Sequence, residues 1–569
     1  MPEYLAPGVY VEETSFRAKS IEGVSTSTAG FVGLTRRGPV ANPASGNLLE
    51  LITSFGDFER IYGGLENLTF GSAPSINYLA HAVRSFFNEG GGRLYISRVY
   101  APTAPNAGAA AVTLGNVDVK ARFPGKAYEG SVSFQQTLTL ASSVTLKSAP
   151  IGTLLKVADA YFLKTDTGWF AEDGTTQLTD AQAGAADNNF VSLSVVFTDA
   201  AGNQQTYDNL GLSANHPQAI SKVLSETPSR RSDYLQNPYA VVNRNTSAFT
   251  LRTDLFGDAT ALTNGARVAV LTGGNDGVAP GQSDFEAALK ELASVEDISV
   301  VAAPGYSTLS AAQGIQTALI AHAESRRSYR IAILDTPKSQ SVTEARAVKS
   351  RIDSKYAALY YPWVTVANPL FRPGNAAIPA EIDLPPSGFM AGIYARNDVE
   401  RGVSKSPANE VVRSAIRFER EVNFAEQESL NPFGVNCLRF FPGRGYRVWG
   451  ARTTSSDPEW KYVNIRRYFN YLEQSIDRGT QWAVFESNGP QLWTNVRDTI
   501  TAFLYNEWIS GALLGNSPNE AFFVKCDRST MTQNDLDNGR LICLIGVAVV
   551  KPAEFVIFRI GQKTAEASS

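Results

Sequence analysis

Between residues 266 and 366, short apolar stretches alternate with amphipathic segments of helical length. The expected strands are residues 267–271, 298–303, 329–334 and 357–366, and the expected helices are residues 284–293, 311–325 and 343–355. Nearly continuous apolar strands separated by helices are typical of a parallel sheet that helices cover on both faces. The pattern predicts a central α/β domain, which we place at residues 266–432.

The block at residues 433–552 has a different order of elements. A first amphipathic helix is predicted after the capping pair Asp457-Pro458 and ends at Gly479, and a second begins at residue 490 and ends at Gly515. Short apolar strands are expected at residues 482–485, at residues 522–526 and from Leu541 onward. This block is predicted to be a C-terminal α+β domain, in which helices pack on a mixed sheet.

Each end of the chain carries a strand-like run with little around it to bury it. In residues 1–27 a short run is followed by a linker rich in Ser and Thr, and in residues 553–569 only nine residues follow an apolar run. The runs are Gly8, Val9, Tyr10, Val11, Glu12 and Glu13, and Phe555, Val556, Ile557, Phe558, Arg559 and Ile560. The N-terminal linker reaches roughly 50 Å when extended. Isolated terminal strands are typical of strand addition to another subunit, while pairing within the same chain is the alternative.

Two further regions complete the division of the chain. Residues 28–100 are predicted to form an N-terminal α/β segment, in which a triple glycine at residues 90–92 follows a helix and precedes a strand. That order is the reverse of a nucleotide-binding turn, so we expect no cofactor there. Residues 101–265 are rich in Ala, Thr, Ser and Gly and contain alternating runs, which predicts a β-rich insertion.

Composition excludes several classes of protein. A net charge of -4 and the absence of long basic runs argue against nucleic-acid binding. The three cysteines are too few for a disulfide framework. The sequence lacks both a signal-peptide pattern and an apolar run of spanning length, so we expect synthesis in a reducing bacterial cytoplasm and no direct membrane insertion.

An enzyme is the main alternative, but the sequence contains few features that support catalysis. The familiar hydrolase, phosphate-loop and zinc-protease motifs are missing, and the three histidines, His81, His216 and His322, lie in separate segments. Asp276, in the loop at residues 272–277, and Asp335 could hold a metal or act as a base, but such carboxylates more often cap turns. We expect no catalytic residue, cofactor or metal. A hydrolase or a nucleotide-binding enzyme, and a capsid or surface-layer protein, remain as alternatives.

Several short motifs, in this order, resemble one known family. They are residues 7–13 (PGVYVEE), 21–26 (IEGVST), 31–33 (FVG), 271–277 (LTGGNDG), 385–398 (PPSGFMAGIYARND), 406–409 (SPAN) and 551–555 (KPAEF). Together they are similar to the sheath proteins of contractile phage tails and of phage-tail-like contractile injection systems, over most of the chain outside the insertion.

The resemblance implies a structural subunit that stacks in six-fold rings around an inner tube and contracts to drive the tube through a target envelope. It implies a non-catalytic central domain of subtilisin-like topology, an outward-facing insertion, and terminal arms that add strands to neighbouring subunits. The implied partners are further copies of the chain, the inner tube, and baseplate and tail-terminator proteins, within a virion tail or an injection particle. We hypothesise that a C-terminal helix faces the tube, with Lys461, Arg466, Arg467 and Arg497 as candidate contacts.

Overall fold

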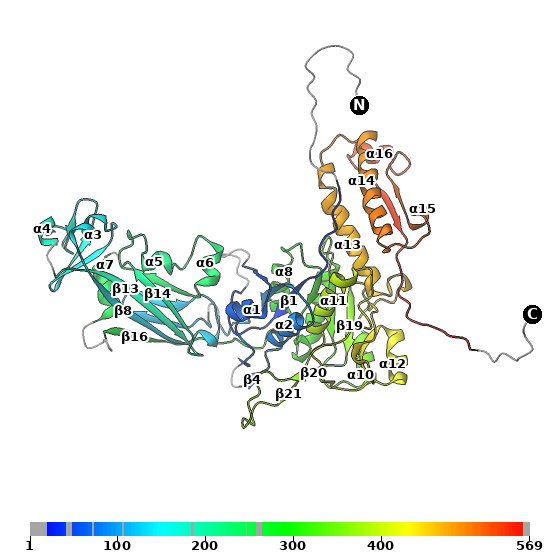
Figure 1. The fold of residues 1–569 in the computed structure, drawn as a ribbon, viewed down its shortest axis with the longest axis horizontal. Helices are drawn as coiled ribbons and strands as arrows, with labels where there is room; N and C mark the ends of the chain where they lie inside the picture. Colours follow the sequence, from blue (N-terminus) through cyan, green and yellow to red (C-terminus); the bar gives the residue numbers. More distant parts are fainter. Residues whose placement is uncertain are drawn as a thin grey trace, which may run out of the picture.

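The computed structural model describes residues 20–40, 48–70, 73–104, 107–183, 187–245, 247–257 and 265–560. Figure 1 shows a central body, a β-rich part that projects to one side of it, and a C-terminal layer of long helices standing on it. The mixed α/β and α+β class predicted from the sequence is confirmed. Among the described helices, none combines the length and apolar character needed to cross a bilayer.

The body is built on an eight-stranded sheet with the order β2-β5-β1-β17-β18-β19-β23-β24. The strands are β1 (Thr28–Gly33), β2 (Leu51–Ile52), β5 (Arg93–Arg98), β17 (Val300–Ala302), β18 (Ile331–Asp335), β19 (Ala357–Tyr361), β23 (Val435–Phe441) and β24 (Gly445–Val448). The six inner strands run parallel, and β2 and β24 pair antiparallel at the two edges. The predicted parallel sheet is therefore present.

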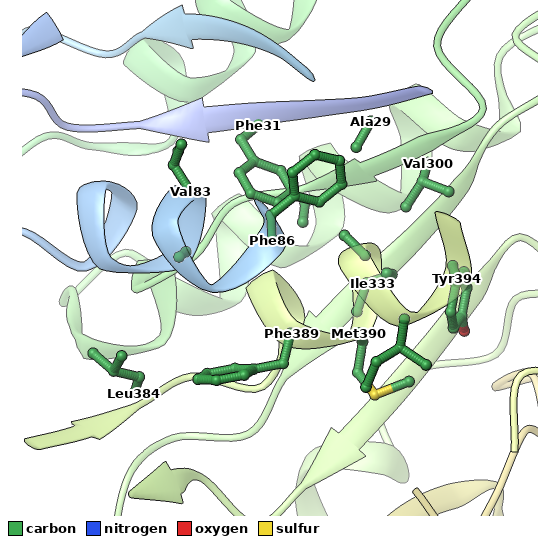
Figure 2. Close-up of a cluster of buried hydrophobic side chains, with 14 of the residues drawn as sticks. Ala29, Phe31, Val83, Phe86, Val300, Ile333, Leu384, Phe389, Met390 and Tyr394 are labelled. Atoms are coloured by element: carbon green, nitrogen blue, oxygen red, sulfur yellow. The ribbon is translucent and has the colours of Figure 1, made fainter. Parts of the chain in front are cut away.

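Helices cover both faces of this sheet, as the apolar strands require. One face carries α1 (Phe55–Tyr62), α2 (Tyr78–Asn88) and α11 (Ser387–Arg401), and the other carries α8 (Gln282–Leu292), α9 (Ala312–Glu324), α10 (Val342–Lys349) and α12 (Phe424–Leu430). Within β1, Phe31 packs toward the first face and Val32 toward the second, both fully buried. Figure 2 shows Phe31 and Phe86 lying against each other above Phe389 and Met390 of α11.

Two expectations about the sheet need correction. Residues 266–271 form β16 (Ala266–Leu271), which pairs antiparallel with a strand of the insertion instead of joining the parallel sheet. Val268 and Val270 of β16 are 55% and 63% exposed, so this apolar run is an edge strand and not a buried one. Its place in the body is taken by β1 and β5, two strands from the N-terminal α/β segment.

The region at residues 101–265 is β-rich, as predicted. Its main sheet has the order β12-β11-β10-β9-β13-β8-β16, with β14 also paired to β13, and a smaller sheet has the order β15-β7-β6. The strands are β6 (Ala111–Leu114), β7 (Val117–Ala121), β8 (Gly130–Leu140), β9 (Leu154–Val157), β10 (Ala160–Lys164), β11 (Trp169–Phe170), β12 (Gln177–Leu178), β13 (Asn189–Asp199), β14 (Gln204–Leu210) and β15 (Tyr239–Asn243). Short helices α3 (Ser143–Ser148), α4 (Asp180–Ala183), α5 (Ile220–Val223), α6 (Arg231–Gln236) and α7 (Ala248–Phe256) lie between them. Strands β8 and β13 pair along their whole length and form its backbone.

The C-terminal layer is formed by two long helices and a two-stranded sheet. These are α13 (Val463–Gly479), α14 (Pro490–Ile509), β25 (Phe522–Lys525) and β26 (Leu544–Val547), with short α15 (Pro518–Ala521) and α16 (Gln533–Asp537). Both predicted helices are confirmed, although α14 ends before Gly515. The strand predicted at residues 482–485 is wrong: a 3-10 turn occupies Gln481–Ala483, and Phe485 is fully exposed.

Two small sheets remain. The strands β20 (Val364–Ala367), β21 (Glu381–Leu384) and β22 (Arg417–Phe418) pair in the order β21-β20-β22 beside the body, and β3 (Leu68–Phe70) pairs with β4 (Ala73–Ser75).

The local sequence determines where several helices begin. At α10, for example, the Ser341 hydroxyl accepts from the Glu344 N–H while the Glu344 carboxylate accepts from the Ser341 N–H. This capping box satisfies N–H groups that the first helical turn leaves free.

Candidate assembly surface

The C-terminal segment leaves the body as extended backbone and buries none of its large apolar side chains. No strand is assigned to residues 550–560, and Figure 1 shows this part of the chain running away from the helices. The exposed side chains are Phe555 (71%), Val556 (68%), Ile557 (78%), Phe558 (83%) and Ile560 (96%). Consecutive exposed apolar side chains are typical of a surface that binds another protein.

Glu554 fixes the point where this segment leaves the body. Its carboxylate accepts from Arg452 Nε and Nη2, each at 2.7 Å, from Asn431 Nδ2 at 2.9 Å and from the Tyr462 hydroxyl at 2.9 Å. The Lys461 ammonium lies 3.3 Å away. Partial burial alone would raise the pKa of Glu554, but the hydrogen bonds from Arg452, Asn431 and Tyr462 outweigh it and lower the pKa to about 2. Within the described part of the chain, the segment is thus exposed from Phe555 to Ile560 and held at Glu554, just before it.

The N-terminal segment is also anchored to the body. We call the anchored residues of a segment its root: Glu554 for the C-terminal segment and residues 21–27 for the N-terminal one. The predicted strand residues Gly8, Val9, Tyr10, Val11, Glu12 and Glu13 lie outside the described residues. From residue 21 to 27 the chain lies along α13, where the Val24 N–H donates to the Ser475 hydroxyl at 3.1 Å and Ile21 is buried. The Thr26 hydroxyl donates to Asp398 at 2.6 Å, and Arg467 donates to the Thr26 carbonyl at 3.0 Å.

Two of the four candidate tube contacts are interior side chains. Arg467 pairs with Asp398 at 2.5 Å, and both side chains are 3% exposed. Arg466 is 2% exposed, donates to Asn470 at 2.9 Å and pairs with Glu473 at 2.8 Å, while Trp460 and Tyr356 lie against its guanidinium. Neither arginine offers a charge at the surface, so we withdraw both as tube contacts. The expectation failed because helix-face reasoning treats arginine as exposed.

The other two candidates remain accessible. Lys461 is 34% exposed but already faces Glu554. Arg497, on α14, is 43% exposed, and its nearest carboxylate belongs to its neighbour Asp498 at 3.0 Å. An exposed pair of adjacent residues is weak, so the Arg497 guanidinium can turn to another carboxylate at little cost.

The small sheet formed by β25 and β26 has open edges. The two strands pair with each other from Phe522 and Val547 to Lys525 and Leu544. Within the part of the chain that the structure describes, no strand pairs with the outer edge of either, apart from a single bridge between Leu513 and Val549 beyond the end of β26. Phe523 and Leu544 are 57% and 50% exposed. An open strand edge is a template for pairing with another chain.

The carboxylates considered as catalytic groups have structural partners. Asp276 accepts from the N–H groups of Lys126 and Thr69, each at 3.0 Å. Asp335 is 1% exposed at the end of β18 and accepts from the N–H and hydroxyl of Ser387, at 2.7 and 2.6 Å, at the start of α11. Burial raises the pKa of Asp335 to about 7, against the opposing effect of those hydrogen bonds. Among the described residues, no cluster of His, Cys, Asp and Glu is arranged to hold a metal ion.

The histidines are dispersed over three parts of the fold. His322 lies on α9, with its Nε2 at 2.6 Å from Arg330 Nη1, and burial followed by the charge of Arg330 lowers its pKa to about 4. His81 lies on α2, where burial, with a smaller effect of Arg84, lowers its pKa to about 4. His216 lies in the β-rich region, where its Nδ1 accepts from the Gln218 N–H. Each histidine has a structural setting of its own, and among the residues that the structure describes no carboxylate is hydrogen-bonded to any of the three in the manner of a catalytic triad.

The fold defines a class: a layered α/β protein in which the last described residues, 555–560, are an exposed, mostly apolar segment. Two family models match this chain. The phage tail sheath protein central domain matches residues 279–454, and the phage tail sheath C-terminal domain matches residues 455–563, together half of the chain. The chain belongs to the phage tail sheath protein family. Sheath proteins are structural, and the chain is accordingly not an enzyme.

Curated relatives agree with this assignment. A putative prophage major tail sheath protein of Pseudomonas aeruginosa (strain UCBPP-PA14) is 30% identical over 267 residues, which cover 46% of this chain and 64% of the relative. The tail sheath protein of Vibrio phage KVP40 is 26% identical over 179 residues, which cover 31% of this chain and 25% of the relative. The matched segments thus span less than two thirds of either relative.

Solved structures share the fold over nearly the whole chain. The helical sheath of the anti-feeding prophage in its contracted state has a TM-score of 0.55 at 21% identity, covering 98% of this chain and 99% of that one. The sheath complex of an extracellular contractile injection system, PVC, also contracted, has a TM-score of 0.52 at 20% identity, covering 99% of each chain.

The sequence contained the motif at residues 551–555 but gave no sign of what Glu554 does. Its partner Arg452 is 102 residues away. In the same way, Asp398 ends one of the motifs that carry the resemblance, yet its pairing with Arg467 across 69 residues follows only from the packing of α11 against α13. For Glu554, the single signal in the sequence was an acidic residue inside an otherwise apolar run.

Proposed function

We propose that this chain is the structural subunit of a contractile sheath, which polymerises as stacked six-fold rings around an inner tube and contracts to drive that tube through a target envelope. The observation that carries the proposal is the exposed apolar segment at residues 555–560, rooted by Glu554. Family membership and the contracted sheath structures with the same fold support it.

In this proposal the terminal segments are exchanged between subunits. Residues 555–560 of one copy add to the open edge of β25 or β26 of another, and the N-terminal strand at residues 8–13 is donated in the same way. Apolar side chains on the segment and the exposed Phe523 and Leu544 beside the open edges are compatible partners. Backbone pairing gives affinity, and the alternate side chains give register.

The energetics favour the exchange. Burying five apolar side chains contributes roughly 7 to 15 kcal/mol, and four to six ladder hydrogen bonds add about 2 to 9 kcal/mol. Ordering six residues opposes this by about 6 to 12 kcal/mol. Mid-range values leave a gain of roughly 7 kcal/mol before the loss of translational freedom, which a second arm on the same subunit reduces through effective concentration.

Contraction then needs no nucleotide. An extended lattice that is kinetically trapped stores free energy in every subunit, and release to a contracted lattice with larger contacts supplies the work. The trap requires a contact made only in the extended state, which we assign to the inner tube, with Arg497 as the remaining exposed candidate on α14. The insertion at residues 101–265 faces outward, and baseplate and tail-terminator proteins lie at the two ends of the sheath.

Negative-stain microscopy of the purified full chain tests the proposal. The expected result is hollow ribbed cylinders, and a chain that ends after Glu554 keeps its root but should remain as single subunits. Cylinders of unchanged frequency from the shortened chain would exclude exchange of the C-terminal segment. A monodisperse small particle from the intact chain, at every concentration tried, would exclude the sheath itself.

The tube contact has a separate test. When the chain is assembled with its inner tube protein, Arg497→Glu should reduce the yield of extended sheath while contracted cylinders still form. The matched control is Arg244→Glu, on a residue of the insertion that is 63% exposed and should leave both forms unchanged. Extended sheath at the normal yield in Arg497→Glu would remove Arg497 as a tube contact.

A further inference from the structure

Two of the three cysteines lie opposite each other across the small C-terminal sheet. Cys526 follows β25, Cys543 precedes β26, and the last pair of the ladder between them is Lys525 with Leu544. Continuing that antiparallel register by one step places Cys526 directly across from Cys543. Each thiol affects the pKa of the other, and neither forms a disulfide in this structure.

The position suits a covalent bond. Residues directly opposite in an antiparallel pair have Cα atoms about 4.5 to 5.5 Å apart, inside the range of about 4.4 to 6.8 Å that disulfides span. Both side chains pack in the apolar cluster that α14 forms with the sheet, together with Phe522 and Val524. The third cysteine, Cys437, is buried in β23 of the central sheet, where its thiol contacts the Val435 carbonyl. It belongs to a different core cluster and provides an internal control.

We propose that Cys526 and Cys543 form an intrachain disulfide when the protein meets a low-molecular-weight disulfide such as oxidised glutathione. The thiolate of Cys543, the more exposed of the two, attacks one sulfur of the small disulfide and expels one thiolate. Cys526 then attacks the Cys543 sulfur of the mixed disulfide, the protein S–S bond forms and the second small thiolate leaves. The two protons lost by the protein end on the two released thiols, so the small disulfide is reduced and the cysteine pair is oxidised.

The surroundings indicate a structural lock and not a catalytic pair. Burial raises the pKa of Cys543 to about 12 and also raises that of Cys526. Because the thiolate is the reactive form, exchange at neutral pH is slow in both directions. A bond formed here therefore persists once the oxidised glutathione is removed.

The bond would close the loop at residues 527–542, which contains α16, and tie β25 to β26. Closing a loop restricts the unfolded chain and stabilises the closed element. Under the proposed function these two strands accept the exchanged segments, so the bond would fix the acceptor sheet after a particle leaves the reducing cytoplasm. That consequence rests on the proposed function, whereas formation of the bond does not.

The test uses the full chain, incubated in glutathione buffers of increasing oxidised fraction, acid-quenched, denatured and alkylated, with the sites mapped by mass spectrometry. The expected result is that Cys526 and Cys543 lose alkylation together, without stable glutathione adducts, while Cys437 stays alkylated. Cys437→Ser should behave like the unmodified sequence, and Cys526→Ser should leave Cys543 alkylated or bound to glutathione. Independent loss at the two cysteines, or glutathione adducts as the end product, would overturn the proposal.

A second measurement does not depend on labelling. Oxidation should raise the temperature of the unfolding transition by several degrees in the unmodified chain, and the shift should be absent from the double variant Cys526→Ser, Cys543→Ser. An equal shift in the double variant would assign it to another cause and contradict the lock. If the disulfide forms and the intact chain still makes no cylinders, the proposed function fails while this inference stands.

Discussion

The exposed C-terminal segment gives the sharpest prediction. Ile557→Asp together with Phe558→Asp changes two side chains that are 78% and 83% exposed in the single subunit. The subunit should therefore keep its stability, within the roughly 0.5 kcal/mol typical of surface changes. Burying each of these side chains in a neighbour is worth about 1.5 to 3 kcal/mol, so the pair loses about 3 to 6 kcal/mol per contact.

A loss of that size raises the subunit concentration needed for polymerisation by about 10² to 10⁴-fold. Sedimentation of a concentration series, with microscopy of the pellets, measures this directly. The control is Val144→Asp, on α3 of the insertion, where an equally exposed valine (76%) should be replaceable without effect. Polymerisation of the double variant at the concentration of the unmodified chain would refute strand donation by this segment, and so would an equal defect in Val144→Asp.

Three further predictions concern ionisable groups that are buried or partly buried. Arg467→Met leaves Asp398 buried without its cation and should reduce the free energy of unfolding by about 3 to 5 kcal/mol in denaturant titrations. The control Arg497→Met should change it by less than about 1 kcal/mol. Equal effects of the two substitutions would show that the Arg467–Asp398 pair is not desolvated. Glu554→Gln keeps the shape of the root but not its charge, so protease cleavage within residues 550–554 should accelerate while the unfolding temperature of the body stays the same. Unchanged cleavage there would show that the ion pairs do not hold the segment. Asp335 has a raised pKa, so the folded chain keeps a proton that the unfolded chain has lost, and its contribution to stability is complete below its ordinary pKa and is lost as the pH rises through about 7. The free energy of unfolding should fall between about pH 4 and pH 7, and less steeply in Asp335→Asn; parallel curves would contradict the assignment.

The sequence predicted elements better than it predicted their partners. The periodicity of α13 and α14 was sufficient because a helix bonds to itself, and strands and loops seldom produce an amphipathic pattern of that length. The run at residues 267–271 was recognised as a strand but assigned to the wrong sheet, because strand pairing is decided by contacts distant in sequence. The four-residue run at 482–485 was too short to distinguish a strand from a turn.

For the candidate assembly surface, too, some features could be predicted from the sequence and others could not. The prediction that the apolar run at residues 555–560 has little around it to bury it agrees with the exposure of its side chains among the described residues. The exposure of arginines was not predictable from a helix face. Arg466 and Arg467 are neighbours on α13, yet one is enclosed by Trp460 and Tyr356 and the other by Asp398, and these contacts depend on how α13 lies on the body.

The two roots show how force would pass between exchanged segments. The N-terminal root is bound to Ser475 and Arg467, both on α13, and the C-terminal root is bound to Tyr462, the residue that precedes the first turn of the same helix. In Figure 1 the N-terminal segment runs beside α13, and the C-terminal segment leaves the body on the other side of the helical layer. If neighbours pull on both segments, as the proposed function requires, the load enters at α13 on the N-terminal side and at Arg452, next to the start of α13, on the C-terminal side. The connections between subunits can then stay closed under load, because each segment is anchored by an ion pair that includes a buried arginine, Arg467 with Asp398 and Arg452 with Glu554.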